Sequence, residues 1–545
     1  MKRYLTAISA LLFCTLSNAQ NFNPKVEVTN DYETRMADIA KQSLSMNVPD
    51  SLLQFDYNFD YSVFDSPYKG AYEFSPYTVQ MTPEASPYGG SRFWMKAGAG
   101  YALQPVLKAV WSPLPKADSR MSIYQDFDGY FGPYRRLDNG LKAIKGQYFD
   151  GYDFSEKLGV EGSKNFEKFI LKGGLEYGGL YTWENLYDTM FHTGTAKVGV
   201  SSVVSEASKA FYDVDVMYRF GYDTSASLTE NDVRVSGSAG PLLRKFYRVA
   251  VDFDFLYSGL TGGYERGLSH LNITPKAGIS AGIIDFDLGL TVSSADSEVN
   301  LFPSIDASVA LGNANSFHAS LTGRNTVNSY YDMKQLNHFF DLTYSGTGSG
   351  LIAATRERLN VSAGFKGHAS DKFQYDLSAG MVNYENAPLW RFFDFNGYDR
   401  LGVWYGAFQQ VRADFRMLLT TDRFDMDGNL AFRMDYDVPE MCVEDPMLAG
   451  GINMRYNWNR RFFVGLSCDA SMARNIVEAV APSVPAVAGP VPGYIDLGVN
   501  AEYRLNSRWA FWAEGGNLLN QTIQKTPGYA RQGVNFTAGI CLRIR

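Results

Sequence analysis

Side chains of the kinds that bind metals or carry out catalysis are scattered along this 545-residue chain. No two of its five histidines have the short spacing of a metal site. Neither a Gly-x-Ser-x-Gly nucleophile motif nor a Walker phosphate-binding motif occurs. The sequence therefore predicts no catalytic centre, cofactor or metal. The histidines are His192, His270, His318, His338 and His368.

Two short motifs resemble parts of binding loops but are incomplete. Residues 346–350 read Gly-Thr-Gly-Ser-Gly without a following lysine, which indicates a flexible linker rather than a phosphate site. Residues 425–429 read Asp-Met-Asp-Gly-Asn and lack the remaining ligands of a calcium loop. The beginning of a strand is the better interpretation there.

One stretch, residues 390–400, combines many aromatic side chains with charges of both signs. In a long outer connection it would stack on a glycan or peptide, or bind a partner protein. The alternative is an interfacial belt beside a loop that packs on itself. Residues 477–491 are nearly all Ala, Val and Pro, which indicates burial against a partner or in a lumen. The candidate ligand or partner residues are Trp390, Phe392, Phe393, Phe395 and Tyr398.

The elements that position these side chains are predicted to be β-strands, because apolar and polar residues alternate along them. The alternation is strict over residues 534–544 and recurs over 210–222, 246–257 and 494–503. Charges on the second face are too frequent for a packed core, so that face is expected to be wet. This pattern favours a transmembrane barrel over a soluble sandwich.

Composition supports the same all-β class. Aromatic residues make up 15% of the chain, which also contains 51 glycines, as expected for strands that curve between aromatic belts. No stretch reaches the ~18–20 apolar residues of a membrane helix. The net charge of −8 argues against a nucleic-acid partner. Composition alone leaves a secreted solenoid or sandwich open.

Residues 1–19 have the features of a signal peptide. Two basic residues precede an apolar run, residues 5–16, and a small-residue cleavage site follows at Ala19. The run is too short for the alternative, a membrane anchor. Cys14 lies inside the run, so it is not a lipoprotein cysteine, and the mature chain is expected to be exported without a lipid anchor.

The C-terminal block has a distinctive sequence. Residues 511–520 read Phe-Trp-Ala-Glu-Gly-Gly-Asn-Leu-Leu-Asn, Pro-Gly-Tyr follows at 527–529, and a closing strand begins near Gly533. This block resembles the last hairpin of TonB-dependent receptors, although the chain ends on Ile544-Arg545 where the family usually has an aromatic residue. The resemblance implies a large closed antiparallel barrel, residues 91–545, in the outer membrane of a Gram-negative bacterium.

Residues 20–90 lack this alternation and are rich in Asp, Tyr, Ser and Pro. The family places a full plug domain here, so the chain resembles a plugless relative of the kind found among Bacteroidota. Val26, Glu27, Val28 and Thr29 resemble the box that engages TonB, and an ordinary disordered N-terminus is the alternative. We expect this short irregular segment to enter or cap the lumen, with inward-folded outer loops or a partner protein as competing closures.

About 22 strands are predicted, joined alternately by short turns and long loops, with both chain ends in the periplasm. The expected short turns are residues 162–165, 312–315, 368–371, 420–422, 457–460 and 506–508. The expected long loops are residues 128–150, 181–191, 325–356, 385–401, 474–492 and 518–532. Residues expected to face lipid are Val249, Phe253, Val499, Phe536 and Ile540. Residues expected to face the lumen are Asp252, Asp254, Asp496, Asn500 and Arg543.

Two functions of different classes follow. In the first, the barrel takes up a nutrient or solute, with energy from TonB if the box is used. In the second, an accessory barrel anchors partner proteins in an outer-membrane complex. The family's common role favours transport, whereas the missing plug removes its energy-coupled gate. The expected partners are outer-membrane lipid and either TonB or outer-membrane proteins, and no enzymatic activity is expected.

Overall fold

The computed structural model describes most of residues 92–544. The gaps are residues 102, 114–117, 185–186, 205–207, 244–246, 313, 341–351, 396–397 and 478–488. The predicted signal peptide, residues 1–19, and the N-terminal segment, residues 20–90, lie outside the described residues. The box-like residues Val26, Glu27, Val28 and Thr29 therefore lie outside them too.

The described residues form long β-strands and one short helix. In chain order they are β1 (Phe93–Tyr101), β2 (Val106–Trp111), β3 (Ser119–Leu137), β4 (Ala143–Asn165), β5 (Phe169–Glu184), β6 (Tyr187–Ser202), β7 (Ala210–Asp223), β8 (Leu228–Pro241), β9 (Tyr247–Gly262), β10 (Arg266–Ala281), β11 (Ile284–Ala295), β12 (Glu298–Leu311), β13 (Asn315–Val327), α2 (Tyr330–Leu336), β14 (Ala354–Ser370), β15 (Phe373–Phe395), β16 (Tyr398–Thr420), β17 (Phe424–Tyr436), β18 (Leu448–Trp458), β19 (Phe462–Ser471), β20 (Tyr494–Arg504), β21 (Trp509–Gly516), β22 (Ala530–Arg531) and β23 (Asn535–Ile544).

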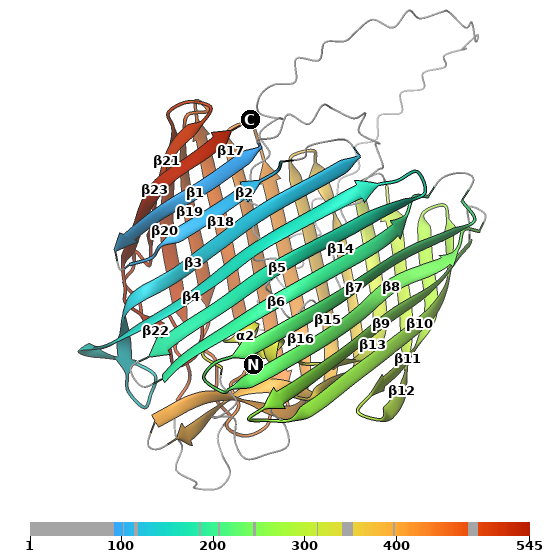
Figure 1. Cartoon of the computed structure of the whole chain (residues 1–545), viewed down its shortest axis with the longest axis horizontal. Coiled ribbons are helices and arrows are strands. Elements are labelled where there is room, and N and C mark those ends of the chain that lie inside the picture. The colour runs from blue at the N-terminus through green and yellow to red at the C-terminus, as the bar shows by residue number, and fades with distance from the viewer. Residues whose placement is uncertain are drawn as a thin grey trace, which may run out of the picture. The chain divides into compact units, whose positions relative to one another are not determined.

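The strands close into one antiparallel barrel (Figure 1). The two-residue β22 pairs with β3 alone, and the other 22 strands form the ring. The ring closes where β1 pairs with β23, from Phe93 opposite Ile544 to Tyr101 opposite Phe536. A closed ring leaves no open sheet edge in the membrane, where unpaired backbone groups are costly. The predicted fold class and the even strand number are confirmed.

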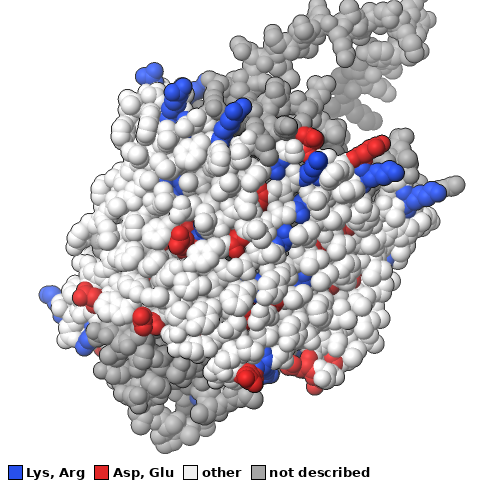
Figure 2. Space-filling model, in the orientation of Figure 1, with Lys and Arg blue, Asp and Glu red and all other residues white. Residues whose placement is uncertain are grey.

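The two faces of the wall differ in polarity as the alternation predicts. Val499 and Phe536 point outward and are exposed (40% and 53%), as on the wall of a membrane-spanning barrel. Asp254 points inward and pairs with Arg234 at 2.9 Å. Alternation along the strands places the other seven predicted residues on the same two faces. In Figure 2 the visible outer wall is largely free of charge. No described helix is long and apolar enough to cross a membrane.

The connections alternate in length only in part. The rim where β1 begins and β23 ends carries short turns such as residues 371–372, 421–423 and 459–461. The opposite rim carries the longest connections, such as residues 328–353 and 472–493, but also short turns such as residues 263–265 and 296–297. Both ends of the barrel lie at the first of these rims. One short turn is displaced, because β4 continues to Asn165 and the turn falls at residues 166–168.

Three predicted long loops are instead continuous strand hairpins, so these predictions were wrong. Residues 128–150, 181–191 and 385–401 lie mostly in β3–β4, β5–β6 and β15–β16. The physical reason is aromatic pairing across neighbouring strands, which lets the backbone ladder continue beyond the wall. The Phe154 ring, for example, stacks on Phe131 at 5.0 Å and on Tyr181 at 4.5 Å between centroids.

Candidate functional site

The helix α2 lies in the connection between β13 and β14, which folds into the lumen (Figure 1). Ser329 begins the helix with a capping box: its hydroxyl accepts a hydrogen bond from the Asp332 backbone N–H at 3.1 Å, and the Asp332 carboxylate accepts from the Ser329 N–H at 3.2 Å. Tyr330 and Met333 are fully buried. A polar outer connection thus becomes an internal element of the barrel.

Charged residues of β7 and β8 hold the helix from the wall. The Glu230 carboxylate accepts hydrogen bonds from the backbone N–H groups of Tyr330 at 2.7 Å and Tyr331 at 3.0 Å. Asp223 accepts from the Tyr330 hydroxyl at 2.6 Å and pairs with Lys334 Nζ at 3.1 Å. All of these side chains except Tyr331 are buried. Buried charges are stable only when they are paired, so these contacts fix the position of α2.

An arginine of the same wall adds two further contacts. Arg219 pairs with Asp232 and donates to the Ser329 hydroxyl at 3.2 Å. Its guanidinium also lies 3.7 Å from the centroid of the Tyr331 ring. In the β7–β8 ladder Arg219 is directly opposite Asp232, so the wall itself sets the geometry of this pair. The capping residue and the first turn of α2 are therefore held from two sides.

The connection then reaches across the lumen. His338 contacts Asp153 of β4 at 2.7 Å, although the connection leaves the wall at β13, far around the ring. Phe339 stacks on Tyr529 of the β21–β23 connection with 3.8 Å between centroids. Arg531 of β22 pairs with the same Asp153 at 2.8 Å. Two long connections thus meet inside the barrel.

Two other outer segments pack against this assembly. Trp390 and Val403 of the β15–β16 hairpin lie against the cluster that contains Phe340 and Met333. Cys442 of the β17–β18 connection is buried beside the other face of the hairpin. We define the cap as residues 328–340, 387–406, 437–447 and 517–534. It closes over the lumen from the rim with the long connections.

The predicted aromatic stretch belongs to this cap. Phe392 is buried in a cluster with Leu401 and Val443, and Trp390 lines a cavity below the cap. The backbone of Phe393, Phe395 and Tyr398 lies in the hairpin, and their side chains lie outside the described residues. Residues 478–488 of the predicted apolar loop lie outside them as well, while Val491 is buried in the same cluster as Phe392.

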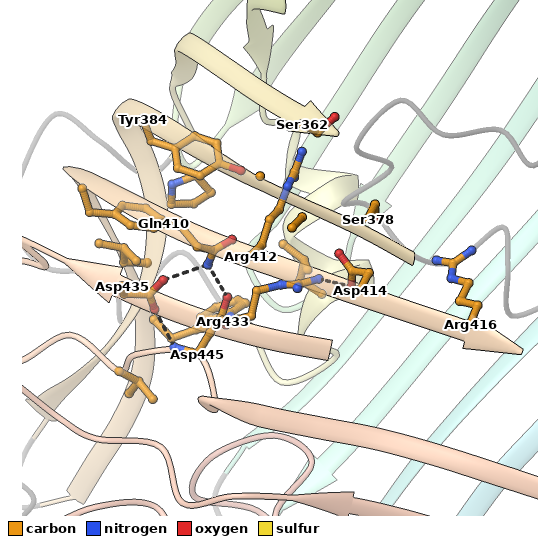
Figure 3. A pocket seen from close by; sticks show the side chains of 18 of the residues that line it. Ser362, Ser378, Tyr384, Gln410, Arg412, Asp414, Arg416, Arg433, Asp435 and Asp445 are labelled. Atoms are coloured by element: carbon orange, nitrogen blue, oxygen red, sulfur yellow. Dashed lines mark hydrogen bonds and ion pairs between the residues drawn. The ribbon is translucent and has the colours of Figure 1, made fainter. Parts of the chain in front are cut away.

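A cavity of about 410 Å³ lies on the luminal face of β13–β17 (Figure 3). Its apolar lining includes Leu336 of α2, Pro388, Leu389, Trp390, Val403, Phe408 and Val443. Its polar lining carries carboxylates and guanidinium groups from β15, β16, β17 and the β17–β18 connection. The polar residues are His318, Ser362, Asp376, Ser378, Tyr384, Gln410, Arg412, Asp414, Arg416, Arg433, Asp435 and Asp445.

Some of these charges neutralise one another within the wall. Arg433 donates to Asp414 at 2.7 Å and also to the backbone carbonyls of Ala413 and Phe432. Gln410 donates to Asp435 at 2.8 Å and to Asp445 at 3.0 Å. These contacts hold the side chains in place around the cavity, as Figure 3 shows.

Charged groups of both signs held beside apolar side chains form an arrangement suited to binding a solute. Among the described residues, no group of His, Cys, Asp and Glu is placed to hold a metal ion. The Cys442 thiol, which lies in a connection outside the strands, is buried, and burial raises its pKa to about 12, so it is a poor nucleophile. Apart from Trp390, the cavity residues were not among the predicted candidates. Their only signal was the polar side chain at every second position of β16: Gln410, Arg412, Asp414 and Arg416.

Comparisons with known proteins agree on the fold. No protein-family model and no curated protein matches the chain. The ferric enterobactin receptor PfeA from Pseudomonas aeruginosa is 10% identical over 83% of this chain and 80% of its own, with a TM-score of 0.59. The siderophore receptor PirA from Acinetobacter baumannii is 9% identical over 83% and 80%, with a TM-score of 0.60. The copper transporter OprC is 11% identical over 84% and 80%, with a TM-score of 0.57. The expected resemblance to TonB-dependent receptor barrels is thus confirmed at the level of the fold.

Proposed function

We propose that this chain is an outer-membrane receptor barrel that binds a small solute in its lumen and takes it up when the cap moves. The observation that carries the proposal is the cap itself, a set of outer connections folded across the lumen over a polar cavity. A barrel of 22 strands without contents would be an open aqueous channel. Inward-folded connections that leave a solute-sized cavity suit a gated binding protein.

The contacts of the cap are of a kind that can be made and broken as a unit. Glu230, Asp223 and Arg219 project from the rigid wall, and their partners all lie in one segment, residues 328–340. When this segment moves away, water can solvate each of the separated charges. Movable connections on a rigid barrel are where gating elements are expected.

Uptake is also the role suggested by the similar proteins, which include siderophore receptors and a copper transporter. On this proposal the chain lies in the outer membrane and draws energy from TonB through Val26, Glu27, Val28 and Thr29. The solute need not be a siderophore or copper, because the structural similarity concerns the fold. Residues 20–90 remain candidates for a second closure from the rim where the chain begins.

The alternative is an accessory barrel that anchors partner proteins. Such a barrel would be expected to present its long hairpins to the outside. Instead, Phe392 and Leu401 near the tip of the longest hairpin are buried in the cap together with Leu141 from the β3–β4 turn. These three apolar side chains are therefore packed inside the molecule, which favours uptake.

The test replaces residues 328–340 by a Gly-Ser linker and measures ion conductance in planar bilayers. The uncapped barrel is made in the full chain and in a chain that lacks residues 21–88, so that closure by the N-terminal segment cannot hide the effect. A linker inserted in the turn at residues 371–372, on the opposite rim, is the matched control. We expect conductance to rise in the uncapped variants and not in the control. An uncapped chain lacking residues 21–88 that is no leakier than the capped one would refute the proposal.

A further inference from the structure

The carboxylates at one end of the cavity lack a cation. Asp435 and Asp445 share the Gln410 amide, and the Asp445 backbone N–H donates to Asp435 at 3.0 Å. Neither forms an ion pair with any residue that the structure describes. Two carboxylates side by side repel each other, and one amide does not neutralise them. This end of the cavity is therefore suited to a positively charged group.

A guanidinium group one step along the wall lacks an anion. Arg412 donates to the neutral side chain of Asn360 at 2.8 Å and has no carboxylate partner within the described part of the chain. Its cross-strand neighbour Arg433 is already neutralised by Asp414. Guanidinium groups bind carboxylates well because their N–H groups match the two carboxylate oxygens. Arg412 is therefore free to bind an incoming carboxylate.

The spacing of the two ends limits the size of the ligand. Asp435 of β17 is opposite Gln410 of β16, and Arg412 is the next luminal residue of β16, about 7 Å along the strand. The Arg412 side chain extends to Asn360 of β14, away from β17, so its guanidinium lies farther than this from the carboxylates. An extended peptide of two to three residues spans about 7–10 Å. In Figure 3 the carboxylate pair and Arg412 lie on the same wall of the cavity, with Gln410 between them.

The rest of the cavity fits this size and adds a preference for an apolar side chain. The volume of about 410 Å³ exceeds that of a single amino acid, and Leu336, Trp390 and Val403 add apolar surface to the lining. The two carboxylates would repel a purely anionic ligand bound at Arg412. Arg412 would in turn repel a purely cationic ligand bound at the carboxylates. A zwitterion satisfies both ends.

From these charges and their spacing we infer that the cavity binds short peptides with free termini, of two to three residues and with an apolar side chain. The ammonium group lies at Asp435 and Asp445, and the carboxylate lies at Arg412. This inference rests on the proposed function, since it names the class of solute that the barrel would take up. No covalent step is involved.

The test uses calorimetry on the purified full-length barrel in detergent, with three probes: Ala-Leu, N-acetyl-Ala-Leu and Ala-Leu amide. We expect Ala-Leu to bind at least about tenfold more tightly than either blocked form, because each block removes one charge-assisted pair. Asp435→Asn should weaken Ala-Leu at least tenfold without affecting the N-acetyl form. Arg412→Gln should weaken Ala-Leu without affecting the amide.

Arg234→Gln is the matched control. Arg234 faces the lumen from β8, where it pairs with Asp254, and it does not line the cavity. The variant should leave Ala-Leu binding unchanged within twofold. Equal binding of all three probes, or no binding of any, would overturn the inference. A barrel that conducts when uncapped but does not bind Ala-Leu leaves the proposed function intact, whereas one that never conducts contradicts the proposed function.

Discussion

Glu230→Ala should release the cap while leaving the barrel intact. The Glu230 carboxylate is buried and accepts two backbone hydrogen bonds from the first turn of α2, at 2.7 and 3.0 Å. A hydrogen bond contributes about 0.5–1.5 kcal/mol, so losing two should cost the docked cap about 1–3 kcal/mol. Because 1.4 kcal/mol corresponds to a factor of ten, the open population should increase about 5- to 150-fold.

The assay is hydrogen–deuterium exchange followed by mass spectrometry of the barrel in detergent. Peptides that cover residues 328–340 should exchange faster in Glu230→Ala by this factor, up to the limit of free exchange. Peptides from β14 should not change. The matched control is Glu298→Ala, which removes an exposed carboxylate that pairs with Arg356 at the same rim. An increase of less than threefold over residues 328–340 in a folded variant would show that Glu230 does not hold the cap.

Three further predictions concern other parts of the chain. Burial raises the pKa of the Cys442 thiol to about 12, so almost no thiolate exists at pH 8. Maleimide should therefore label Cys442 far more slowly than a free cysteine, as followed by peptide mass spectrometry. Rapid labelling would mean that residues 437–447 are not packed as described. Spin labels at Val499 and Phe536 should be accessible to oxygen, and a label at Asp496 to an aqueous quencher; the opposite pattern would reverse the two faces of the wall. Deleting residues 21–88 while keeping the signal peptide should raise bilayer conductance and sensitise cells to large antibiotics if this segment is a second closure; an inserted barrel that is no leakier than the full chain would exclude that role.

The barrel itself was predictable because its signal is local. Side chains of a strand alternate between two faces whatever the partner strand is, so the charge pattern around Asp254 or Asp496 marks the luminal face directly. The even strand number was predicted from the alternation of short turns with long connections, which holds only in part. The exact lengths of the hairpins were not predictable. The β3 and β4 strands, for example, continue beyond the wall where aromatic rings such as Phe131 and Phe154 pair between neighbouring strands, and such pairing depends on register.

The cap and the cavity below it depend on contacts between residues far apart in the chain. Glu230 holds Tyr330 across 100 residues, Arg531 pairs with Asp153 across 378, and Gln524 binds the Leu141 carbonyl across 383. No local sequence pattern predicts such pairs. In the sequence, each partner is only a polar residue near the end of a strand. The same holds for the aromatic stretch, residues 390–400. Its composition is compatible with an exposed binding loop and with a packed loop, and only long-range contacts distinguish the two.

By itself, then, the sequence determined the strands, their lipid and luminal faces and the closed barrel, because hydrophobic burial acts residue by residue at a fixed period of two. Only the tertiary structure decided which connections fold inward, which charges are neutralised there, and that Arg412 faces a cavity shared with Asp435 and Asp445. The physical reason is that a charge is satisfied by whatever lies within a few ångströms of it. Closing the ring brings together residues that the linear chain keeps far apart.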